Sequence, residues 1–201
     1  VQTYALILKT GLPSFCRQGL ASAATVALNV NAAVYGDSAV AAMSIVGRIF
    51  MLVLSMVLGF GQGYQPVVGY NFGARRFDRV KRAFWFALIT STLFLAAVGA
   101  VGFFLAPQVI ALFRADDLEV IAIGSYACRA QCLLLALEPL IVLCNMSFQT
   151  TGRAWQAILI SSCRQGLCFL PLIFLLPRLM GLRGIQLTQP AADICTFLIC
   201  I

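Results

Sequence analysis

Long apolar stretches separated by short polar segments run through all 201 residues of the chain. A helix that spans a bilayer needs about 20 apolar residues, and six stretches reach or approach that length. We predict helices over residues 11–35, 39–68, 83–105, 121–148, 157–176 and 184–201. The chain stops inside the last apolar run, so we expect that helix to be truncated. The pattern therefore predicts an all-α integral membrane protein, with one six-helix transmembrane bundle over residues 1–201.

The composition agrees with lipid as the surrounding solvent. Hydrophobic residues make up 61% of the chain and charged residues 10%, whereas soluble domains carry about 45–50% and about 25%. A water-soluble fold of this length could not bury so much apolar surface, and the expected partner is the lipid bilayer. The chain begins at Val1 rather than at Met, and we expect it to be a fragment of a longer polypeptide.

Basic residues gather between the second and third predicted helices. Residues 70–82 carry five positive charges against one negative charge, that of Asp78. Basic loops mark the cytoplasmic side of membrane proteins, so we predict that residues 70–82 are cytoplasmic and that the Gly36-Asp37 turn lies outside. Such arginines ordinarily fix topology and meet anionic headgroups. The net charge of +7 is explained by this topology, and no nucleic-acid partner is expected.

The chain contains no histidine, and its eight cysteines all lie in apolar stretches without a Cys-x-x-Cys pair. These features argue against a metal site, a disulfide framework or a catalytic triad. Free cysteine packs as a small hydrophobe, which is the expected role here. We predict neither an enzyme nor a cofactor.

A repeated pentapeptide places polar residues inside two predicted helices. Residues 16–20 and 163–167 both read Cys-Arg-Gln-Gly-Leu. Ionisable groups in membrane spans are costly, and they often mark a transport pathway. The pairs Arg17-Gln18 and Arg164-Gln165 are therefore candidates for lining a cavity. The alternative is structural: the glycine of each copy would permit close helix packing, with Arg and Gln bonded to neighbouring backbone.

Two acids also lie within predicted spans. Glu138 precedes Pro139 in the middle of the fourth helix, and Asp193 lies in the last helix. Proline removes a backbone hydrogen bond and bends a helix, and transporters use such breaks at binding sites. Both acids are candidates for carrying a proton or a cation. The alternative for Glu138 is an ion pair with Arg129 or with a residue of another helix, or an interface position. Arg129 lies nine residues earlier, about 13 Å along the helix axis, so the two do not pair directly within the helix.

The second predicted helix ends in a segment rich in glycine and glutamine, from Gly59 to Arg76. Glycines in membrane helices allow close packing and bending, and Pro66 is a second candidate for helix bending. Gln62 and Gln65 in this segment, together with Gln149 at the end of the fourth helix, are further candidates for lining a cavity. No strand precedes the glycines and no Lys-Ser/Thr follows them, so a phosphate-binding loop is excluded.

Several segments resemble the multidrug and toxic compound extrusion (MATE) family. The most specific is residues 61–80, which read Gly-Gln-Gly-Tyr-Gln-Pro-Val-Val-Gly-Tyr-Asn-Phe-Gly-Ala-Arg-Arg-Phe-Asp-Arg-Val. The other matching segments are Gly11-Leu12-Pro13, Phe148 to Ala154, Arg164-Gln165-Gly166 with Pro171, and Pro190-x-x-Asp193. The resemblance covers nearly the whole chain.

The resemblance implies twelve helices in two lobes of six, of which this chain is similar to the C-terminal lobe. It implies a secondary antiporter of the cell membrane that exports small organic cations in exchange for H⁺ or Na⁺, with the missing N-terminal lobe as its partner. Some members carry an acid in the seventh helix, where this chain has Leu20-Ala21-Ser22. The chain is more similar to members whose coupling acid lies in the N-terminal lobe.

Two alternatives remain open. One is a flippase for lipid-linked oligosaccharides or peptidoglycan precursors, from the same superfamily, which the cavity arginines Arg17 and Arg164 would suit. The other is a membrane scaffold subunit without transport activity, which would pack those arginines in a dry interior.

Overall fold

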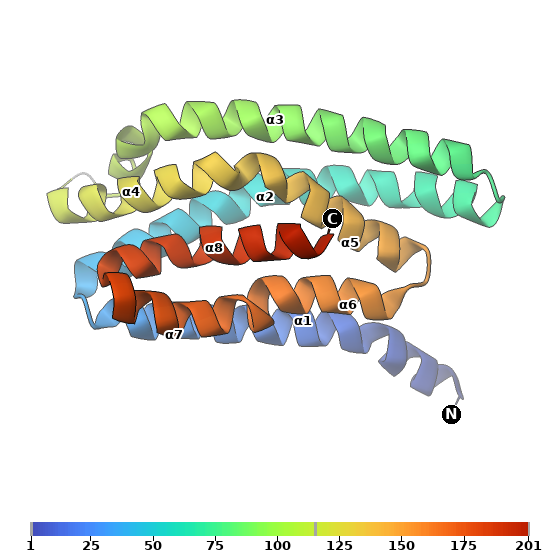
Figure 1. Ribbon diagram of the computed structural model, residues 1–201, viewed down its shortest axis with the longest axis horizontal. Helices are drawn as coiled ribbons and strands as arrows, with labels where there is room; N and C mark the ends of the chain where they lie inside the picture. The colour runs from blue at the N-terminus through green and yellow to red at the C-terminus, as the bar shows by residue number, and fades with distance from the viewer. Residues whose placement is uncertain (1, 115, 201) are drawn as a thin grey trace.

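The computed structural model describes the backbone of residues 2–114 and 116–200, and the side chains of residues 18–114, 116–153 and 155–200. The described residues form six helical rods that run roughly side by side along the long axis of the molecule (Figure 1). Three rods are single helices at the start of the chain: α1 (Gln2–Ala33), α2 (Asp37–Gly73) and α3 (Phe77–Ala111). The predicted fold class is thereby confirmed.

The next two rods are interrupted. The fourth consists of α4 (Leu118–Leu134), a 3₁₀ turn η1 (Leu135–Leu137) and α5 (Glu138–Thr150). The fifth consists of α6 (Ala154–Ser162), a π-helical turn η2 (Cys163–Leu167) and α7 (Phe169–Met180). Helix α8 (Leu182–Cys200) is the sixth rod. Each rod coincides with a predicted span but extends further at most ends, because short turns leave few residues outside a helix.

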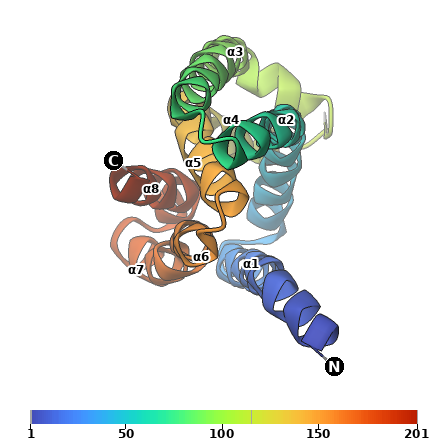
Figure 2. The same cartoon turned by 90° about the vertical axis from the view of Figure 1, so that its right-hand side faces the viewer.

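Four of these rods are long and apolar enough to cross a membrane within the described residues: 37–73, 77–111, 118–150 and 155–180. The fourth rod is the most enclosed of these four. Half of the residues in its most apolar 18-residue stretch are buried, whereas the corresponding share is 28% in α2 and 17% in α3. Viewed end-on, α5 lies between α2, α6 and α8 (Figure 2). Residues placed on α5 therefore face several other helices at once.

Helix α3 presents a broad apolar face to the surroundings. Its exposed side chains include Trp85, Phe86, Leu93 and Phe104. A soluble protein rarely leaves such a contiguous face uncovered, whereas a membrane protein offers it to the acyl chains. The buried core lies on the other side, where Leu95 and Ile110 are fully enclosed.

Glycine sets the first turn and several close helix contacts. Gly36 has φ of 101°, which few other residues adopt, and it links α1 to α2 as the sequence predicted. A Cβ on Gly61 would collide with Met146, and one on Gly69 would lie 3.1 Å from Thr150 Cγ2. The glycine-rich end of α2 therefore packs closely on α5, although Gly59 and Gly63 face open space.

The two candidate bending prolines behave differently. Pro139 occupies the first turn of α5, directly after the 3₁₀ turn, so the helix is interrupted there. A 3₁₀ turn and a Pro-initiated helix are compatible because Pro lacks the N–H that an inner helix position would need. Pro66 lies within α2, which is helical without interruption. The bend at Pro66 stays a prediction.

Candidate functional site

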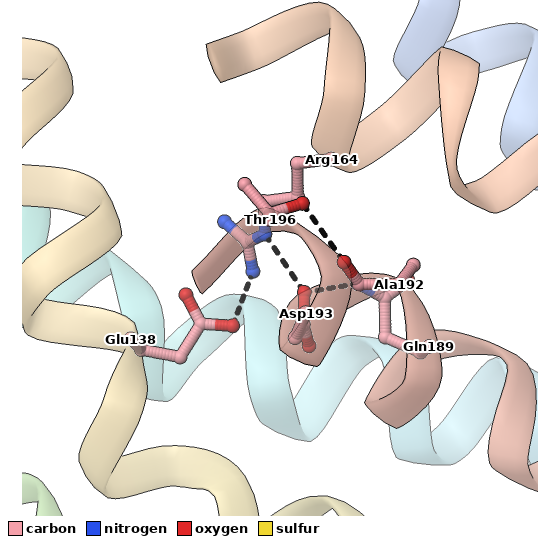
Figure 3. Close-up of polar contacts among 6 residues, drawn as sticks. All are labelled: Glu138, Arg164, Gln189, Ala192, Asp193 and Thr196. Carbon is pink, nitrogen blue, oxygen red and sulfur yellow. Dashed lines mark hydrogen bonds and ion pairs between the residues drawn. The ribbon is translucent and has the colours of Figure 1, made fainter. Parts of the chain in front are cut away.

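Arg164 is held between two carboxylates from different helices. Its Nη2 atom donates to Glu138 Oε1 at 2.6 Å, and its Nε atom donates to Asp193 Oδ1 at 3.1 Å. Figure 3 shows Arg164 of η2 lying between Glu138 of α5 and Asp193 of α8. Residues 138, 164 and 193 therefore form an ion cluster that joins three rods, and we call it the Arg164 cluster.

The Arg164 cluster is withdrawn from the surroundings. The side chains of Glu138 and Asp193 are 4% and 3% exposed, and that of Arg164 is 17% exposed. Buried charges are tolerated only when they are paired and hydrogen-bonded. Gln189 Nε2 adds a donor to Asp193 Oδ1 at 3.0 Å, whereas Glu138 Oε2 is buried without a partner among the described groups.

Helix irregularities place two members of the cluster. Arg164 lies in the π-helical turn, where Cys168 N–H bonds Cys163 O at 2.9 Å instead of the carbonyl four residues back. Pro171 follows one turn later, and it has no N–H to donate to the carbonyl at position 167. A π-helical turn often accompanies a functional site in a helix. Glu138 directly follows the 3₁₀ turn of the fourth rod.

A cavity of about 250 Å³ opens beside Arg164. Polar side chains from three rods cover much of its wall: Gln62, Gln65, Asn145, Gln149, Ser161, Arg164 and Gln165. Apolar side chains complete it: Leu58, Ile141, Val142, Met146 and Ile160. The wall combines amides, one guanidinium and an apolar side, which is a composition typical of small-molecule sites.

Some of the amides are fixed by hydrogen bonds. Gln149 Nε2 donates to Asn145 Oδ1 at 2.5 Å, and Asn145 Nδ2 donates to Ser161 Oγ at 2.7 Å and to Ala157 O at 2.8 Å. This chain of bonds connects α5 to α6 on one side of the cavity. By contrast, Gln165 Oε1 is buried without a donor among the described groups.

Most of the predicted pathway residues converge here. Gln62, Gln65, Gln149, Arg164 and Gln165 all line the cavity. Glu138 and Asp193 are absent from the cavity wall, and each instead forms an ion pair with Arg164.

The first copy of the repeat contributes less to the cavity. Gln18 is exposed on α1 and is not part of the cavity wall, so the structure does not bring it to the other candidates. The side chain of Arg17 lies outside the described residues. Leu20, however, packs against Gly166 of the second copy, because a Cβ on Gly166 would lie 3.1 Å from Leu20 Cδ2.

Glu138 does not pair with Arg129, in agreement with their separation along the helix. Arg129 is exposed, donates from Nε to Phe103 O at 3.3 Å, and lies over the Phe103 ring at 5.7 Å. The arginine that pairs with Glu138 comes instead from the fifth rod, the other option that the sequence left open.

Sequence reasoning missed Asn145 and Ser161 as lining residues. Asn145 lies in a largely apolar part of the fourth span, so extending the rule that singled out Glu138 from ionisable to polar side chains would have found it. No group of three or more potential metal ligands occurs among the described residues. The seven cysteines with described side chains are free, and Cys128, Cys132 and Cys163 are buried.

Comparison with known proteins decides the family. A family model described as MatE matches residues 13–175 of the chain. The chain belongs to the MatE family. The resemblance seen in the sequence is thereby confirmed, and the chain belongs to a family of transporters rather than of enzymes. It is accordingly part of a multi-pass plasma-membrane protein.

Relatives of the MatE chain are named as multidrug exporters. The Multidrug export protein MepA of Staphylococcus haemolyticus is 25% identical over 193 residues, covering 96% of this chain and 42% of the relative. MepA of Staphylococcus aureus strain NCTC 8325 is 26% identical over 180 residues, covering 89% and 39%. The chain therefore spans less than half the length of these curated relatives.

Solved structures share the fold. A MOP superfamily transporter from Pyrococcus furiosus has a TM-score of 0.88 at 25% identity, covering 96% of this chain and 44% of that one. A variant of the Vibrio cholerae MATE transporter VcmN has a TM-score of 0.90 at 20% identity, covering 99% and 45%. The six rods therefore have the same arrangement as the helices in one segment of each of these transporters, a segment that makes up nearly half of its chain.

Proposed function

We propose that this chain forms the C-terminal lobe of a secondary antiporter that exports small organic compounds, cations among them, in exchange for H⁺ or Na⁺. The observation that carries the proposal is the polar cavity beside Arg164. It is lined by the π-helical turn of the fifth rod and by α5, the helix that follows the 3₁₀ turn of the fourth rod. Interrupted helices that line a cavity are typical of secondary transporters. Two relatives carry the name multidrug export protein, which favours export of diverse compounds.

In this proposal the second lobe supplies the facing wall of the cavity and the coupling acid. Alternating access would rock one lobe against the other around the enclosed substrate. The chain spans 42% of the length of its Staphylococcus haemolyticus relative, which leaves room for such a lobe. We expect the 201-residue lobe alone not to transport.

The test is export by the full-length protein in everted membrane vesicles. We expect energised vesicles to accumulate a fluorescent cationic dye, and a proton uncoupler or a sodium ionophore to stop the accumulation. The agent that stops it identifies the coupling ion. Export that persists after both gradients are collapsed would contradict the proposal, and vesicles without the protein provide the control.

A flippase for lipid-linked precursors is the second candidate. The observation that favours it is Arg164 at the cavity wall, because a guanidinium suits a phosphate group. A fluorescent lipid-linked phosphate in proteoliposomes separates the two functions. Translocation of the lipid without dye export would favour the flippase.

A scaffold role would require dry, apolar packing around the arginines. Arg164 instead lies at a cavity lined by four glutamines, which argues against that role as far as the described side chains extend.

A further inference from the structure

The described wall of the cavity presents a guanidinium to a ligand, although two acids lie close by. Arg164 is the one ionisable side chain in the described wall, whereas Glu138 and Asp193 lie outside it and are 4% and 3% exposed. Both carboxylates are directed to the guanidinium (Figure 3). A compound entering the cavity therefore meets Arg164 before it meets either acid.

Arg164 retains donor capacity on that side. A guanidinium carries five N–H donors, and the cluster uses one on Nε and one on Nη2. The Nη1 atom makes no hydrogen bond within the described part of the chain. Two of the cavity amides, Gln62 and Gln65, likewise make no side-chain hydrogen bond there, so both are available as donors from α2.

The remaining wall defines what else the ligand carries. Ile141, Val142 and Met146 provide an apolar surface for a ring. The buried Gln165 Oε1, which lacks a donor among the described groups, can accept from an N–H, an O–H or a water next to the ligand's oxygen. The volume of about 250 Å³ is below the range of roughly 300–1,000 Å³ for drug-sized ligands, so the cavity accommodates one end of such a molecule.

We propose that the cavity binds the carboxylate-bearing end of an aromatic substrate and not its cationic amine. The inference rests on the proposed export function and names the substrate chemistry of this lobe. The ligand oxygen accepts hydrogen bonds from Arg164 and from the glutamines, while its ring lies against the apolar wall. A cationic group of the same molecule is left to the other lobe.

The test uses the purified full-length protein and two dyes that differ at one group. Rhodamine 110 carries a free carboxylate, and rhodamine 123 is its methyl ester. Fluorescence anisotropy gives the Kd of each, and everted vesicles give their export. Because a charge-assisted hydrogen bond outweighs a neutral one, we expect rhodamine 110 to bind about tenfold more tightly. Equal binding of the two dyes, or tighter binding of the ester, would overturn the inference.

A charge-neutral variant locates the effect. Arg164→Gln, Glu138→Gln and Asp193→Asn combined remove all three charges, so no buried charge is left unpaired. We expect this variant to lose the preference for the carboxylate dye, while Gln108→Leu, on the exposed face of α3, retains it. A preference that survives in the triple variant would also overturn the inference. The dye pair on the unmodified protein tests the inference even if the triple variant fails to fold.

The inference and the proposed function fail in different ways. Export of both dyes with no preference refutes the carboxylate subsite and leaves the exporter intact. Failure to bind or export either dye refutes the proposed function itself, and the inference falls with it.

Discussion

Gly166 of one copy of the repeated pentapeptide packs directly against Leu20 of the other copy, with 3.1 Å between a Cβ built on Gly166 and Leu20 Cδ2. The glycine at the same position of the first copy, Gly19, faces open space. The structural alternative for the repeat, close packing at its glycines, is therefore met by Gly166 and not by Gly19. Equivalent residues of the two copies therefore have different surroundings.

This asymmetry makes the two glycines a matched pair. Gly166→Leu would force a side chain into Leu20, and overpacking of this kind costs about 1–3 kcal/mol. Gly19→Leu adds the same side chain without a collision. We expect thermal unfolding in detergent, followed by tryptophan fluorescence, to show a lower midpoint for Gly166→Leu only. Equal shifts in both variants would contradict the packing at Gly166.

Removing only the arginine of the Arg164 cluster should destabilise the protein more than neutralising all three charged residues. Arg164→Gln leaves Glu138 and Asp193 buried without their cation, which costs about 3–5 kcal/mol in comparable clusters. The charge-neutral triple variant leaves no unpaired charge, and we expect it to be more stable than Arg164→Gln alone. The same unfolding midpoints test this order. An Arg164→Gln protein at least as stable as the triple variant would show that the cluster contributes little.

A second cross-helix bond gives a smaller and separable effect. Tyr64 of α2 and Ser147 of α5 lie 2.8 Å apart through their hydroxyl oxygens, and Ser147 Oγ itself donates to Leu143 O at 2.6 Å. Tyr64 is therefore the donor between the two helices. Tyr64→Phe should cost about 0.5–1.5 kcal/mol, while Tyr70→Phe, on a side chain that is 77% exposed, should leave the unfolding midpoint unchanged. A similar shift in both would rule out this bond.

The predicted membrane orientation is open to a direct labelling test. In a cysteine-free background, Ala74→Cys marks the basic turn and Asp116→Cys marks the turn before α4; both positions are exposed. We expect a membrane-impermeant maleimide to label Ala74→Cys in everted vesicles and Asp116→Cys in intact cells. The reverse pattern would invert the topology derived from the positive-inside rule.

The six rods follow from the apolar stretches because a bilayer requires long continuous helices. The sequence predicts the interruptions of the fourth and fifth rods less completely. Pro139 gave a signal for the break in the fourth rod, but the 3₁₀ turn begins earlier, at Leu135. The sequence of the π-helical turn at Cys163–Leu167 does not itself predict the turn, because the same five residues at 16–20 are α-helical. Neighbouring Pro171 and the contact with Leu20 distinguish the second copy.

The sequence singled out the three residues of the Arg164 cluster, but it did not predict which of them form ion pairs. Arg164, Glu138 and Asp193 stand out as charges in apolar spans, but they are separated by 26 and 29 positions. Which arginine meets which acid depends on how the rods pack, and side-chain periodicity does not specify that. The repeat alone does not specify the surroundings of a side chain, because Gln165 of the second copy lines the cavity while Gln18 of the first copy is exposed outside its wall.

On the proposed function, the cavity beside Arg164 lies on the export path. In a cysteine-free background of the full-length protein, Gln149→Cys places a thiol on the cavity wall, and Gln108→Cys places one on the exposed face of α3 as the control. Dye export is measured in everted vesicles before and after reaction with a bulky methanethiosulfonate reagent. We predict that the reagent abolishes export only in the Gln149→Cys protein, and that bound substrate slows the reaction. Full export with Gln149→Cys completely labelled would contradict the claim.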